Sequence, residues 1–134
     1  MRFLIATHGE FSKGITDSVR LIVGDSGTLD QFSMTKSKSQ ESAEIEVKDY
    51  LKKYQGPDLI VLTDVFGGSV ANLFTNFLLQ GYEFQLVTGV NLPLLLTLVL
   101  SEEADSFQSV TQGIEEAKKG IIHVNELIQQ KGGN

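Results

Sequence analysis

The sequence predicts an α/β protein with a doubly wound, mostly parallel sheet of about four strands. Strand-like and helix-like patterns alternate from one end of the chain to the other, which is typical of parallel strands joined by helices. Residues 59–63 are apolar without alternation, as in a central strand covered on both faces. With 134 residues, the chain fits one domain of ordinary size, and we expect that domain to span residues 1–134.

The first half of the chain predicts two strands and two helices. Residues 2–7 form the first strand, and the apolar positions of the following helix are Phe11, Ile15, Val19 and Ile22. Gly24 is placed to end that helix. A short second strand is expected over residues 28–33. Ser37 and Gln40 then have the spacing of a capping box in front of a helix over residues 45–54.

The second half continues the alternation with a strand over residues 59–63, a helix from Gly68 and a strand over residues 82–88. The helix over residues 93–100 is apolar on every side, so we expect it to be deeply buried or covered by a second subunit. Asp105 and Gln108 can cap the last helix. Its apolar stripe consists of Phe107, Val110, Ile114 and Ala117. Residues 120–124 are expected to form one last short strand.

Composition excludes several classes of protein. The chain has no cysteine, so it contains neither disulfides nor a thiolate metal site. Its net charge of −6 disfavours nucleic-acid binding, which needs clustered basic residues. The longest apolar run is too short to insert in a membrane. Because the apolar start is also too short for a signal peptide, we expect a cytoplasmic protein.

Functional side chains are expected where the strands end. His8 follows the first strand and Asp64 follows the third, so both emerge at the carboxyl edge of a parallel sheet, where open α/β sheets carry their functional crevice. Neutral imidazole is a nucleophile near neutral pH. A neighbouring carboxylate can accept its second N–H and fix the tautomer, as in hydrolytic triads. We therefore predict that His8 is phosphorylated and that Asp64 orients it.

Glycine turns next to these residues predict a binding site for the phosphoryl group. Gly9 leaves room beside the ring, while Gly67, Gly68 and Ser69 open a helix whose first amides favour anions. The rim where a partner docks is assigned to Phe66, Asn72 and Asn91. No metal or organic cofactor is called for. Taken singly, these features fit ordinary turns. The second histidine, His123, is expected to have a structural or interface role.

Three segments together resemble the mannose-family IIA domains of the bacterial sugar phosphotransferase system. They are FLIATHG at residues 3–9, TDVFGGS at residues 63–69 followed by Asn72, and TGVNLPL at residues 88–94. The resemblance implies a phosphoryl carrier that receives phosphate from the carrier protein HPr on His8 and passes it to a IIB component, with membrane IIC and IID components. Asp64 falls on the family's orienting aspartate, and residues 67–69 fall on its phosphate-contacting loop.

The resemblance also implies a homodimer in which residues 120–124 are exchanged between subunits and join each sheet as an antiparallel strand. Two departures affect loop shape. Val70 stands where family members often carry proline, and residues 34–37 replace a Pro-Gly turn.

Other functions remain as alternatives. A phosphotransfer subunit of a dihydroxyacetone kinase is similar and uses the same histidine. A histidine phosphatase would have arginine where this chain has Thr7. A receiver domain needs acidic residues at the end of the first strand to hold magnesium, and a flavodoxin-like module needs a longer phosphate loop there.

Overall fold

The computed structural model describes residues 1–132, so Gly133 and Asn134, at the end of the predicted domain, lie outside the described residues. Four parallel strands form one sheet in the order β2-β1-β3-β4. The strands are β1 (Arg2–His8), β2 (Leu29–Met34), β3 (Leu59–Thr63) and β4 (Gln85–Thr88). The helices of the described residues are α1 (Phe11–Val23), α2 (Gln40–Tyr54), α3 (Ser69–Leu79), α4 (Leu92–Val99), α5 (Ser106–Lys118) and α6 (Val124–Gly132). The predicted α/β class is confirmed.

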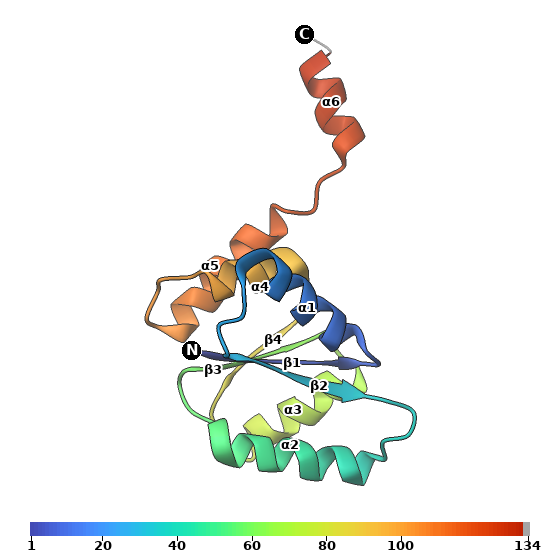
Figure 1. Cartoon of the computed structure of the whole chain (residues 1–134), viewed down its shortest axis with the longest axis vertical. Helices are drawn as coiled ribbons and strands as arrows, with labels where there is room; N and C mark the ends of the chain where they lie inside the picture. Colours follow the sequence, from blue (N-terminus) through green and yellow to red (C-terminus); the bar gives the residue numbers. More distant parts are fainter. Residues whose placement is uncertain (133–134) are drawn as a thin grey trace.

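Helices cover both faces of the sheet (Figure 1): α1, α4 and α5 lie on one face, and α2 and α3 lie on the other. The packing of β3 on both faces explains why its sequence does not alternate between apolar and polar residues. Ile60 and Leu62 point into the core beneath the first group of helices, whereas Leu59 and Val61 point into the core beneath the second. All residues of β3 are buried, as in a central strand of a parallel sheet. No helix of residues 1–132 has the length and apolar character to cross a bilayer.

Side-chain caps fix where three helices begin. Asn91 accepts the backbone N–H of Leu94 at the start of α4, and Asp105 accepts that of Phe107 at the start of α5. The cap of α2 differs from the predicted one. Ser39, two residues after the expected Ser37, accepts a backbone N–H from the first turn. The helix therefore starts at Gln40, which the capping-box prediction had placed at its third position.

The inward face of α5 also differs from prediction. Ala117 is buried as expected, but Phe107 is 60% exposed. The helix approaches α4 with small residues instead, since a Cβ at Gly113 would lie 2.9 Å from a methyl carbon of Leu98. Close helix packing on small side chains thus rotates the expected apolar stripe partly into solvent.

The chain departs from expectation again after α5. Residues 121–123 have no regular secondary structure, and α6 starts at Val124, so the described chain has four strands without a short fifth one. The physical reason is that a strand needs a neighbour for its backbone hydrogen bonds. This segment leads away from the sheet, and α6 stands clear of the body (Figure 1).

The strand order reverses between β1 and β3. From β1 the chain proceeds to β2 on one side, whereas from β3 it proceeds to β4 on the other. The loops that leave β1 and β3 therefore diverge, and such a switch point forms the crevice in which open α/β sheets bind ligands. His8 ends β1, and Asp64 directly follows β3.

Candidate functional site

The site is centred on His8 and Asp64, which are 56 residues apart in the sequence. One oxygen of Asp64, Oδ2, lies 2.9 Å from Nδ1 of the His8 ring and accepts the His8 backbone N–H at 3.0 Å. A carboxylate only accepts, so this contact places the ring proton on Nδ1. The other nitrogen, Nε2, then carries the lone pair that a nucleophilic role requires.

The two side chains differ in their access to solvent. The His8 side chain is 47% exposed, whereas that of Asp64 is 13% exposed. Burial by itself raises the pKa of the Asp64 carboxyl, but hydrogen bonds from the backbone and ring of His8 outweigh it and hold the pKa below its usual value. Asp64 Oδ1 also accepts the backbone N–H of Val65 at 3.1 Å. The carboxylate is therefore charged and fixed, while the ring is accessible to a docking protein.

Ser69 completes the set of contacts around the ring. Its Oγ lies 3.0 Å from Nε2 of His8, and with the proton on Nδ1 the hydroxyl donates to Nε2. Ser69 is also the first residue of α3, whose N-terminus has no side-chain cap. The first amides of a helix have no acceptor within it and carry the positive end of the helix dipole. The ring thus faces an end of a helix that favours a negative group.

Two glycines let the loop after Asp64 approach the ring. Gly67 has a φ of +80°, in the left-handed region that L side chains rarely adopt. Gly68 has an ordinary extended backbone, but a Cβ there would lie 3.1 Å from Cε1 of His8 and 3.3 Å from the carbonyl oxygen of Val65. Gly67 therefore makes the turn, and Gly68 leaves space for the imidazole.

The other residues predicted for the phosphate site and its rim differ in their contacts and exposure. Gly9 follows the histidine with a φ of +58° and donates its N–H to the carbonyl of Met34. Phe66 is 87% exposed. Asn72 donates its side-chain amide to the carbonyl of Gly67, which stabilises the glycine loop. Asn91 uses its side-chain oxygen to cap α4.

Thr7 contributes to the site in a way that the sequence analysis missed. Its hydroxyl oxygen accepts the backbone N–H of Ser12 at 2.7 Å and so satisfies an amide at the start of α1. Glu10, at the capping position, makes no side-chain bond of this kind. A threonine close before a helix is a usable signal, but its position inside the predicted strand concealed it. Thr7 helps to fix the turn that carries His8 and Gly9.

No three His, Asp or Glu side chains of residues 1–132 are grouped as a metal ion would need.

The site of this α/β fold combines a carboxylate-held imidazole, a hydroxyl and a helix N-terminus, which define a centre suited to an anionic group. Residues 2–115 match the family described as "PTS system fructose IIA component". The chain belongs to this EIIA family of the sugar phosphotransferase system, whose members are phosphotransferase components.

Individual relatives agree with this assignment. The chain is 26% identical over 101 residues to a fructose-specific EIIA component of Bacillus subtilis, covering 75% of this chain and 69% of that protein. It is 23% identical over 124 residues to a mannose-specific EIIAB component of Escherichia coli, covering 88% of this chain but only 38% of that longer protein. A crystal structure of EIIA from Streptococcus agalactiae superposes with a TM-score of 0.84 at 22% identity, covering 93% and 98% of the two chains.

Proposed function

We propose that this protein is a cytoplasmic carrier of a phosphoryl group on His8. It accepts the group from phospho-HPr and passes it to a IIB component, which serves sugar uptake. The observation that carries the proposal is the double contact of Asp64 with His8, at 2.9 Å to the ring and 3.0 Å to the backbone. It presents Nε2 as the nucleophile on an accessible ring. Membership of the EIIA family supports the same role.

The chemistry is an in-line exchange between two nitrogens. The Nε2 lone pair of His8 forms a bond to phosphorus while the bond from phosphorus to the donor's histidine breaks, and the donor keeps the electron pair of that bond. The proton on Nδ1 stays where Asp64 accepts it, so the positive charge that develops on the ring is stabilised by the carboxylate. The transfer to IIB repeats these steps with His8 as the leaving group.

The transferred group carries negative charge that the site must balance. Ser69 turns its hydroxyl from Nε2 to a phosphoryl oxygen, and the first amides of α3 supply the positive end of a helix. Such positioning and charge stabilisation account for most catalysis of phosphoryl transfer. Phe66 and Asn91 are proposed to lie on the rim that meets HPr and IIB, with membrane IIC and IID components downstream.

A homodimer is part of the proposal. The exposed apolar residues after α5, among them Ile121 and Ile122, favour coverage by a second copy. β4 is an edge strand with one side unpaired in the sheet, and exchange of residues 120–124 between copies would cover that edge.

The test is labelling by phospho-HPr that carries radioactive phosphate. We expect acid-labile label on the wild-type protein and none on His8→Ala. His123 provides a matched control, because it is the second of the two histidines and its side chain is 69% exposed. His123→Ala is expected to label at the wild-type rate.

Label that persists on a folded His8→Ala variant, or that disappears from His123→Ala, would overturn the assignment. Release of label from the wild-type protein as free phosphate, with none passed to a IIB component, would indicate a phosphatase instead of a carrier.

A further inference from the structure

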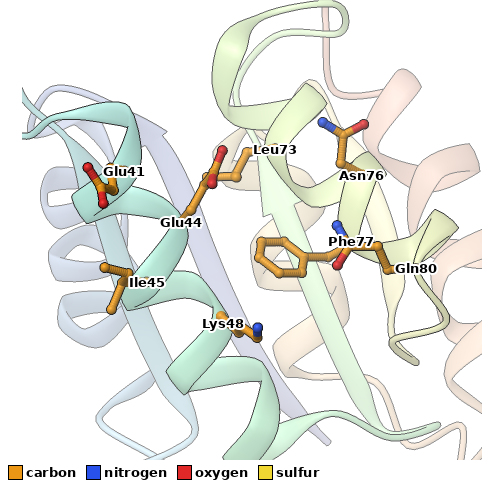
Figure 2. A pocket seen from close by; sticks show the side chains of 8 residues that line it. All are labelled: Glu41, Glu44, Ile45, Lys48, Leu73, Asn76, Phe77 and Gln80. Carbon is orange, nitrogen blue, oxygen red and sulfur yellow. The ribbon is translucent and has the colours of Figure 1, made fainter.

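A groove runs between α2 and α3, on the face of the sheet opposite α1, α4 and α5. Its volume is about 310 Å³. Figure 2 shows the ring of Phe77 in the gap between the two helices, with Leu73 beside it and Glu44 reaching across from α2. Glu41 and Glu44 line the end near the start of α2, and Lys48 lines the other end. The groove is thus apolar at its floor and acidic at one end.

The helix α6 has an apolar face that nothing in the described chain buries. Val124, Leu127 and Ile128 recur at the spacing of one helix face, and Leu127 and Ile128 are 42% and 64% exposed. Lys131 continues the same face one turn later. None of the residues of α6 is buried, and a helix of nine residues is marginal alone in water. This face therefore needs a surface to pack against.

The face of α6 and the groove match in length and charge. Val124 and Lys131 are seven residues apart on α6, as Glu41 and Lys48 are on α2, and both pairs span about 10 Å of helix. If α6 lies antiparallel to α2, Lys131 meets the acidic end of the groove and Leu127 reaches its apolar floor. A parallel arrangement would place Lys131 beside Lys48 instead, where like charges repel.

A second copy must supply the helix. Figure 1 shows α6 leaving on the side of α5, whereas α2 and α3 lie across the sheet. Residues 119–123 link α5 to α6 and span at most about 18 Å at full extension, less than the diameters of two helices side by side. The link is too short to pass around the sheet and both of its helix layers.

We infer that α6 of one copy docks in the groove between α2 and α3 of a second copy, antiparallel to α2. This inference rests on the homodimer proposed above and identifies two surfaces that hold it together. It does not depend on phosphoryl transfer at His8.

Disulfide trapping tests the contact directly, because the chain has no cysteine of its own. A tagged Ile128→Cys copy is mixed with an untagged Ile45→Cys copy, which carries its thiol on the wall of the groove. We expect a covalent heterodimer to form about tenfold faster than with a Leu21→Cys copy, because docking raises the effective concentration of the thiols. Leu21 is a matched control, since it lies on α1 and is 88% exposed.

Variants of the full chain, compared by sedimentation equilibrium, test the energetics. Ile128→Asp is expected to weaken the dimer about tenfold or more, whereas Leu21→Asp leaves it unchanged. Lys131→Glu is expected to weaken it less, and adding Glu44→Lys to that variant is expected to restore part of the loss.

Equal trapping with Leu21→Cys, or a dimer that Ile128→Asp leaves intact, would overturn the docking of α6 while the homodimer stands. A wild-type protein that sediments as a monomer would overturn both the docking and the homodimer. Neither result affects labelling of His8, which is measured separately.

Discussion

A single carboxylate oxygen of Asp64 holds His8 at two points. Oδ2 lies 3.0 Å from the backbone nitrogen of His8 and 2.9 Å from its ring nitrogen Nδ1. The first contact fixes the end of β1, and the second fixes the plane and tautomer of the ring. Backbone position and ring chemistry are therefore coupled through one atom.

Replacement of Asp64 by asparagine is expected to slow phosphoryl transfer by between about 10²- and 10⁴-fold, the span for groups that control a proton on a catalytic histidine. The carboxylate accepts hydrogen bonds on both oxygens, from His8 and from Val65. An amide group of Asn has one oxygen, so a donor must face its NH₂ group. Labelling rates from phospho-HPr measure the effect, and a rate equal to that of the wild type would remove Asp64 from the mechanism.

The pH dependence of stability follows from the lowered pKa of Asp64. A carboxyl with a depressed folded pKa stabilises the protein fully above its unfolded value of about 3.8, and this contribution is lost as the pH falls through the folded pKa. The difference in unfolding free energy between wild type and Asp64→Asn is therefore expected to be large at neutral pH and to shrink in acid. Urea unfolding at both pH values measures it.

The control for this experiment is Asp49→Asn, at an exposed position of α2. We expect this substitution to change the free energy of unfolding little at either pH. A difference for Asp64→Asn that stays constant from neutral pH into acid would contradict the role of its charge.

Gly68→Ala is expected to move the imidazole without unfolding the protein. The new Cβ would lie 3.1 Å from Cε1 of His8, so the ring must shift by a few tenths of an ångström. Transfer should slow about tenfold, because misplacement by 1 Å costs on the order of 10²-fold. Gly14→Ala on α1 is the matched control, since a Cβ there would meet no atom within 4 Å apart from its chain neighbours and the backbone of its own helix. It should raise stability by up to ~1 kcal/mol and leave transfer unchanged, and equal rates for both variants would contradict the steric role.

Asn91→Ala is expected to lower the free energy of unfolding by about 1 kcal/mol, because it removes the cap of α4. Asn91→Asp keeps the capping oxygen and should retain most of the stability. The aspartate variant lacks the amide donor, so its rate of transfer to a IIB component reports any contact of Asn91 with a partner. An unchanged rate would remove Asn91 from the rim.

Much of the fold was predictable because strong local signals agreed. The apolar run of β3 and the cap residue Asp105 act through neighbours in sequence, and the structure confirms both. The adjacency of His8 and Asp64 also followed from the rule that parallel strands end at one edge.

Other features depend on contacts that a local pattern does not contain. Phe107 is exposed because α5 packs on α4 through Gly113. The side chains of α4, which are distant in sequence, determine which face of α5 turns inward. Residues 121–123 are apolar enough for a strand, but pairing requires a free edge within reach. The role of Gly68 was invisible for a similar reason, since it is set by the distance to a ring 60 positions away.

The route of the chain between His8 and Asp64 has a consequence for biosynthesis. The two residues are 56 positions apart, and the chain between them forms α1, β2, α2 and β3. Parallel strands such as β1 and β3 cannot pair through a tight local turn. In a nascent or trapped chain whose β3 has not yet paired with β1, His8 lacks Asp64 as its hydrogen-bond acceptor. Under the proposed function, the chain therefore gains the ability to accept phosphate on His8 only once the sheet is complete.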